Sequence, residues 1–139
     1  MIHRPKFIRF VVYRKHWRSG ERCGLFQAID DVLASEEPPT HLREAITEIA
    51  SWFNAHLKTP FLDPDVRGRQ PEWKIAPQDR SISWIKLDAV EHVTKLFHLK
   101  ALLEEAGWLV DELRTSKPGV LLYEDEFQVV AAPYADTPT

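Results

Sequence analysis

Cationic side chains and an indole gather just after the first apolar run of the sequence. Within nine residues the chain carries Arg14, Lys15, His16, Trp17, Arg18 and Arg22. Guanidinium and ammonium groups neutralise phosphates, and an indole can stack on a nucleobase. The stretch is therefore a candidate anion-binding loop. The alternative, which we prefer, is a solvated loop whose cations meet acids from the C-terminal half of the chain.

A second candidate for chemistry is a carboxylate and a histidine four residues apart, Asp88 and His92, at the predicted entrance of a helix. On a helix this spacing places two side chains on adjacent turns, where the carboxylate orients the imidazole as a general base. His16 is a further weak candidate for catalysis. Lone pairs of this kind are common without any catalytic role, so we prefer a half-buried structural histidine at position 92.

Tryptophans supply the best sequence-level indication of a partner site. Three of the five, Trp17, Trp73 and Trp84, fall in or beside predicted loops. Exposed aromatic side chains there often mark binding surfaces, because one ring offers both apolar area and a polar group. With the cations they define one predicted binding site, which consists of Arg14, Lys15, His16, Trp17, Arg18, Arg22, Trp73, Trp84 and Lys86.

Metal and cofactor chemistry finds little support in the sequence. Cys23 is the only cysteine, and the six histidines never show the four-residue spacing of a zinc-binding helix. No P-loop, dinucleotide fingerprint, nucleophile elbow or kinase signature is present. The acidic run 124–126 is interpreted as an exposed turn rather than a cation site. We therefore expect no metal and no cofactor, and we lean away from an enzyme.

Hydrophobic periodicity predicts the elements that must position these residues. Alternating apolar residues predict a strand over 6–14, and a 3.6-residue repeat predicts helices over 21–35, 40–57 and 87–106. In the first helix, Phe26, Ile29 and Leu33 fall on one predicted apolar face, with Leu25 and Val32 beside them. The connection 58–80 is rich in proline. Three further strands are predicted over 108–115, 120–124 and 127–133.

This order predicts an α+β fold: one compact domain, with a roughly four-stranded, mainly antiparallel sheet and helices packed on one face. Short connections favour a meander for the last three strands. The first strand is expected beside the last one. The domain is predicted to span residues 1–134, followed by a flexible tail over 135–139.

Charge is distributed unevenly along the chain. Residues 1–22 hold seven Lys or Arg against one acid, while residues 104–139 hold eight acids against two bases. If the two ends of the chain lie side by side, their opposite charges neutralise each other. No apolar run is long enough to cross a membrane and no signal-peptide core is evident, so we expect a cytoplasmic protein that does not bind membranes.

Three functions compete on these observations. The preferred one is a small non-catalytic protein-interaction or regulatory module with another protein as its partner. The second is a nucleic-acid or nucleotide-binding protein that uses the basic 14–22 loop, although an overall net charge of −3 argues against it. The third is a small enzyme with a histidine–carboxylate site. No feature of the sequence sets the oligomeric state.

Overall fold

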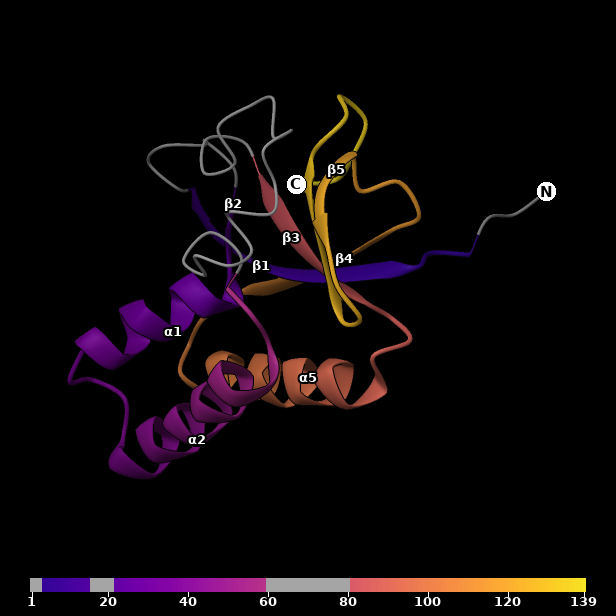
Figure 1. The fold of residues 1–139 in the computed structure, drawn as a ribbon. Coiled ribbons are helices and arrows are strands. Elements are labelled where there is room, and N and C mark those ends of the chain that lie inside the picture. Colours follow the sequence, from indigo (N-terminus) through magenta and orange to yellow (C-terminus); the bar gives the residue numbers. More distant parts are fainter. Residues whose placement is uncertain (1–3, 16–21, 60–80) are drawn as a thin grey trace.

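The computed structural model describes residues 4–15, 22–59 and 81–139, and it shows a single α+β domain, as predicted (Figure 1). In that part of the chain the helices are α1 (Leu25–Ala34), α2 (Thr40–His56) and α5 (Val90–Glu105). The strands are β1 (Phe7–Lys15), β2 (Arg22–Gly24), β3 (Ile82–Lys86), β4 (Val110–Thr115), β5 (Val120–Glu124) and β6 (Gln128–Ala132).

The strands form one curled sheet of six strands in the order β2-β1-β3-β6-β5, with β4 paired to β1 outside this path. Every pairing is antiparallel, which confirms that part of the prediction. β1 pairs with β4 from Phe7 opposite Thr115 to Val12 opposite Val110. On the other side β1 contacts β3 first and β2 later.

Three details of the predicted topology were wrong. β1 lies beside β4 rather than beside the last strand, because β3, where the sequence predicted no strand, lies between β1 and β6. Among the described strands, β4 pairs with β1 and not with β5, so the predicted meander reduces to the β5–β6 hairpin. Residues 22–24 form a strand because they pair with β1, and α1 therefore begins only at Leu25.

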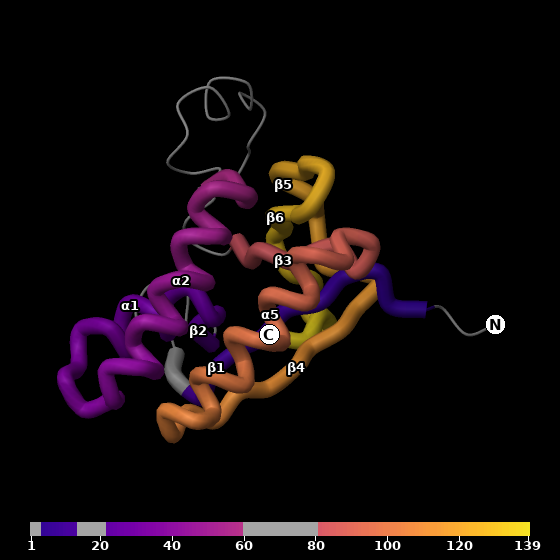
Figure 2. The backbone as a smooth tube through the Cα atoms, turned by 90° about the horizontal axis from the view of Figure 1, so that it is seen from below, coloured from indigo at the N-terminus to yellow at the C-terminus, as the bar shows by residue number. Residues whose placement is uncertain are grey.

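The main core lies between one face of the sheet and the three helices (Figures 1 and 2). Alternate residues of β1, namely Ile8, Phe10 and Val12, point into it, as the period of two predicts. Each helix adds an apolar stripe, for example Ile46 of α2 and Leu99 of α5, both fully buried. Removal of this apolar surface from water is what holds helices and sheet together.

A smaller core cluster lies on the inner side of the curl. Trp84 and Ile82 of β3 and Val129 of β6 are fully or nearly fully buried there, with Phe7 and Leu113 packed against them. Trp84 has an exposed fraction of 0%, so its ring is a core residue. All residues of this cluster come from β1, β3, β4 and β6, so strands cover it and the helices α1, α2 and α5 contribute nothing to it.

Local signals for chain reversal agree with the structure at two places. Gly107 follows α5 with φ of 96°, a left-handed conformation in which glycine commonly ends a helix. Asp125 closes the β5–β6 hairpin: its Oδ1 accepts hydrogen bonds from the main-chain N–H groups of Phe127 and Gln128. The turn predicted over 124–126 joins the antiparallel strands β5 and β6.

The last residues contact the rest of the domain. Thr137 is buried, and its Oγ1 donates to the main-chain oxygen of Lys117 and accepts from the N–H of Tyr134. The division into a domain over 1–134 and a flexible tail over 135–139 stays a prediction. In the described residues no helix combines the length and the apolar character that crossing a bilayer requires.

Candidate functional site

Much of the predicted cationic site falls outside the residues that the structure describes. His16, Trp17, Arg18 and Trp73 lie there, and of Arg14 and Lys15 the structure describes only the main chain, at the end of β1. Arg22, Trp84 and Lys86 are described in full. Arg22 lies in β2, and Trp84 and Lys86 lie in β3. Each of the three contacts other residues of the domain.

Arg22 links the basic N-terminal part of the chain to the acidic C-terminal part. Its Nη1 lies 2.6 Å from Oδ2 of Asp111 in β4, and its Nε donates to the main-chain oxygen of Thr139 at 3.0 Å. Asp111 also hydrogen-bonds Tyr13, and this bond raises the pKa of the tyrosine. The bonds from Tyr13 and Arg22 lower the pKa of the Asp111 carboxyl. The expected neutralisation of cations by C-terminal acids is therefore seen at Arg22.

Lys86 ends β3 and is held in the same way. Its Nζ lies 2.6 Å from Oε2 of Glu124, the last residue of β5, and its main-chain N–H donates to the oxygen of Phe127. A phosphate ligand would have to compete with these internal partners for both described cations of the predicted site. Trp84, the third described member, has no surface to offer because its ring is buried.

Asp88 and His92 are not brought together. Asp88 lies in the turn before α5, which begins only at Val90, so the helical spacing assumed from the sequence does not apply. His92 is buried, with Nε2 2.9 Å from the main-chain oxygen of His56. Its ring stacks on Phe127 at 4.2 Å and contacts Trp52 edge-on at 4.8 Å. These contacts support the structural histidine that we preferred.

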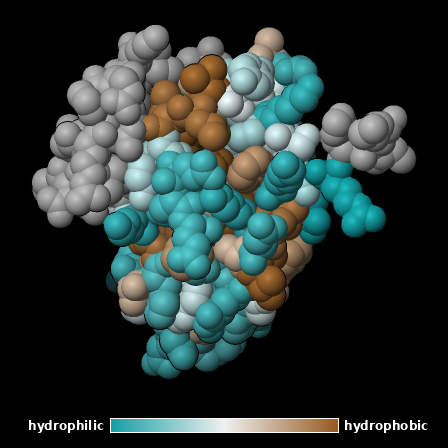
Figure 3. Space-filling view, turned by 45° about the vertical axis from the view of Figure 1, so that its right-hand side comes forward, coloured by the Kyte–Doolittle hydropathy of each residue, from teal (hydrophilic) through white to brown (hydrophobic). Residues whose placement is uncertain are grey.

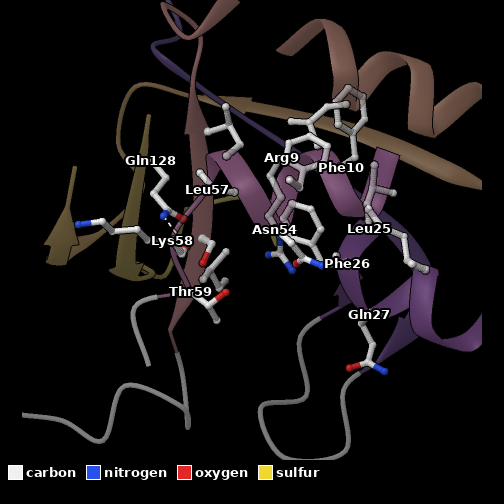
Figure 4. Close-up of a pocket in the computed structure, with 18 of the residues that line it drawn as sticks. Arg9, Phe10, Leu25, Phe26, Gln27, Asn54, Leu57, Lys58, Thr59 and Gln128 are labelled. Atoms are coloured by element: carbon white, nitrogen blue, oxygen red, sulfur yellow. Dashed lines mark hydrogen bonds between the residues drawn. The ribbon is translucent and has the colours of Figure 1, made fainter. Parts of the chain in front are cut away.

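An open groove of about 450 Å³ lies at the junction of α1, α2, β1 and β3. Its walls hold mostly apolar side chains, from Phe10, Leu25, Phe26, Ile29, Ala50, Phe53, Leu57, Ile85 and Leu96. Figure 4 shows Gln128, Lys58 and Thr59 on one side of the space and Arg9, Asn54 and Phe26 on the other. The volume lies in the range of ordinary ligand pockets.

Polar groups in the groove are fixed in place by hydrogen bonds. Gln128, nearly fully buried, donates from Nε2 to the main-chain oxygen of Lys58 at 2.8 Å and to Oδ2 of Asp125 at 3.1 Å. Arg9 donates from Nη2 to the main-chain oxygen of Arg22 at 2.6 Å. Such fixed groups orient a ligand, because their positions are set before it binds.

Asp125 is the residue that positions Gln128. It accepts four hydrogen bonds in total, from Tyr123 Oη, from the main-chain N–H groups of Phe127 and Gln128, and from the Gln128 amide. Burial raises the pKa of the Asp125 carboxyl, but these hydrogen bonds outweigh burial and the net pKa is lowered. The carboxylate thus stays charged at neutral pH and keeps its acceptor role.

Phe26 is the most exposed large apolar side chain of the groove, with an exposed fraction of 42%. Its ring meets Phe53 edge-on at 5.1 Å. The sequence predicted Phe26 on the buried face of its helix, which is wrong. The buried stripe of α1 is Leu25, Ala28, Ile29 and Val32, and Phe26 lies at its edge beside the groove.

Sequence reasoning missed the groove because its walls come from segments far apart in the chain, from Ile8 to Gln128. A period of two or of 3.6 identifies the face of one element but not the space between elements. Among the described residues, no three His, Cys, Asp or Glu side chains gather as metal ligands. The chain matches no protein-family model, no curated protein and no solved structure.

Proposed function

We propose that the protein is a non-catalytic interaction module that binds apolar side chains of a protein partner in the groove between α1, α2 and β3. The observation that carries this proposal is the combination of an apolar floor with an exposed aromatic ring at its margin, Phe26. Aromatic side chains, Phe among them, are enriched at protein interfaces relative to the rest of the surface.

A protein partner suits the groove because of its rim. Asn54, Lys58, Thr59 and Ser83 border the apolar floor and supply donors and acceptors to a peptide main chain. An apolar centre surrounded by a polar rim is the usual anatomy of a protein interface.

Competing functions find less support among the described residues. Arg22 and Lys86 are each paired with an acid of the same chain, which weakens the argument for phosphate binding. His92 points a ring nitrogen at a main-chain oxygen rather than at Asp88, which weakens the argument for general-base chemistry. Both functions remain as outcomes of the test below.

Selection of random peptides displayed on phage against the immobilised protein tests the proposal. We expect the selected peptides to be rich in Phe, Trp, Leu and Ile, and their affinity to change little with salt. Phe26→Ala should weaken binding of a selected peptide by about tenfold or more, as loss of a hot-spot ring does.

Tyr134→Ala is the matched control. Tyr134 has a similar exposed fraction, 47%, and it follows β6, outside the groove lining. Its substitution should leave peptide affinity unchanged. Equal losses in the two variants, or selected peptides that are acidic and released by salt, would overturn the groove as the binding site.

A further inference from the structure

The groove lies where two strands of the sheet diverge. β4 pairs with one edge of β1, so β2 and β3 both pair with the other edge. β3 pairs there with Phe7 and Ile8, whereas the pairing with β2 begins at Val11. The two strands therefore meet β1 at separate points, and Figure 1 shows them as separate arrows.

Only the end of β3 pairs with β1. Ile82, Ser83 and Trp84 each pair with a residue of β6 on one edge of β3. On the other edge β3 pairs with β1 at Ile85 and Lys86, and no described strand pairs with the three residues before them. Main-chain N–H and C=O groups that point to this open edge can pair with an added extended chain.

The groove follows this open edge rather than one face of the sheet. Its lining includes residues 8–10 of β1 and residues 81–83, where β3 begins. Consecutive strand residues point to opposite faces of a sheet. A space that touches all of these residues therefore runs between the two strands (Figure 4).

We propose that the partner binds the groove as a short extended segment that pairs through its main chain with the open edge of β3. The inference rests on the proposed function and specifies the kind of partner that the same groove takes. The bound segment adds a strand to the sheet and carries apolar residues at every second position. Main-chain hydrogen bonds supply affinity in this mode, and pockets for alternate side chains supply specificity.

Apolar side chains of the helices favour this alternation. Ile85 packs in the main core with α1 and α2, and Ser83, two residues earlier, lies on the same face of β3. A strand beside Ser83 directs every second side chain toward this face, where Phe26, Phe53 and Leu57 line the groove. An amphipathic helix satisfies its main-chain groups internally, and its apolar residues recur every three or four positions.

N-methyl scanning of a peptide obtained from the phage selection tests this mode of binding. Each main-chain N–H of the synthetic peptide is replaced in turn by N-methyl, which removes the donor. The N–H groups of a strand point alternately toward and away from a partner strand. We expect affinity to fall at least about tenfold at every second position of the paired stretch and less than about threefold at the positions between.

Ser83→Lys tests the open edge from the side of the protein. A charged side chain on a strand edge opposes the addition of another strand, so we expect at least about a tenfold loss of peptide affinity. Ser83 is exposed, and circular dichroism checks that the variant keeps its fold. Leu121→Lys is the control, because Leu121 is half-exposed in β5 and does not line the groove. Its affinity should equal that of the wild type.

The outcomes separate this inference from the proposed function. Losses without alternation along the peptide, or selected peptides whose apolar residues recur every three or four positions, would overturn the extended mode and leave the groove as the binding site. Full affinity of Ser83→Lys would overturn the extended mode equally. A selection that yields no binding peptide, or peptides that bind Phe26→Ala as tightly as the wild type, would overturn the proposed function and this inference with it.

Discussion

Two regions of the molecule, the described cations and the groove, present opposite kinds of surface. Arg22 and Lys86 bear full charges, but each lies 2.6 Å from an acid contributed by a distant strand. The groove carries few charges, yet it leaves Phe26 half-exposed beside a floor of apolar side chains. Charge that is conspicuous in a sequence can thus be satisfied within the fold, while an accessible apolar surface arises where residues from remote segments meet.

The largest expected effect is a difference in stability between two variants, one at Trp84 of the predicted cationic site and one at Phe26 of the groove. Trp84→Ala should lower the free energy of unfolding by about 3–5 kcal/mol, because it empties a buried ring position. Phe26→Ala should cost less than about 1.5 kcal/mol, since its ring is already partly in water. Urea unfolding of both variants measures the difference, and similar losses would contradict their assignment to core and surface.

Trp84→Phe sharpens this comparison. Nε1 of Trp84 is buried and forms no hydrogen bond with the described residues. Removing the unpartnered N–H offsets part of the cost of a smaller ring, so we expect a loss of no more than about 2 kcal/mol. A loss as large as that of Trp84→Ala would show that the indole N–H has a stabilising partner.

The next effect concerns Asp125, whose carboxylate accepts a hydrogen bond from the side-chain amide of Gln128 in the groove. Asp125→Ala should lower the free energy of unfolding at neutral pH by about 1–2 kcal/mol, because it removes the acceptor of four hydrogen bonds; partial exposure keeps the loss modest. The pKa of Asp125 is lowered in the fold. Its contribution is therefore complete above the unfolded-state pKa and disappears as pH falls through the folded-state pKa.

Urea unfolding of wild type and Asp125→Ala across the acidic range measures this dependence, and the two proteins should converge as the carboxyl becomes protonated. Glu126→Ala is the control, because Glu126 is exposed in the same turn. A difference between wild type and Asp125→Ala that grows on acidification would contradict the lowered pKa.

A smaller effect is expected at the paired cation of β3. Lys86→Met should change the free energy of unfolding by only about 0.2–1 kcal/mol, the usual contribution of an ion pair open to solvent. Glu124→Gln should have an effect of similar size, and added salt should reduce both. A much larger loss that salt does not affect would show that Lys86 has a role beyond this pair.

The smallest expected effect is a shift in the pKa of Tyr13, which lies beside the Arg22–Asp111 pair. Asp111 raises the pKa of Tyr13 through its hydrogen bond and its charge, and Arg22 opposes it. Asp111→Asn should therefore lower the pKa of Tyr13, and Arg22→Gln should raise it further. Absorbance titration, with Tyr13→Phe to identify the signal, measures both shifts, and shifts in the same direction would contradict this arrangement.

Sequence patterns predicted the elements more successfully than their arrangement. The strand at 120–124 and the helix that became α2 follow from periodicity, which depends only on neighbouring residues. The place of β1 depended on β3, a five-residue strand whose pairing partners are remote in sequence. The helical spacing assumed for Asp88 and His92 does not apply, because α5 begins only at Val90, and a difference of a few residues in where a helix begins changes which side chains share a face.

The groove lay beyond such patterns for a related reason. Phe26 belongs to an amphipathic helix whose buried stripe is centred on Leu25, Ile29 and Val32, so its own side chain lies at the edge of the stripe. Gln128 gives no signal in the sequence, since an amide within a strand becomes informative only when Lys58 and Asp125 lie beside it. The neutralisation of Arg22 was easier to anticipate, because opposite charges dominate opposite ends of the chain.

The central claim is that the groove, rather than the described cations, is the contact surface. NMR titration of isotope-labelled protein with the neutral apolar dye N-phenyl-1-naphthylamine tests it most directly. We predict that resonances of Phe26, Asn54 and the Gln128 side-chain amide shift, at low and at high salt alike, while those of Arg22 and Lys86 do not. Absence of binding, or shifts centred on Arg22 and Lys86, would contradict the claim.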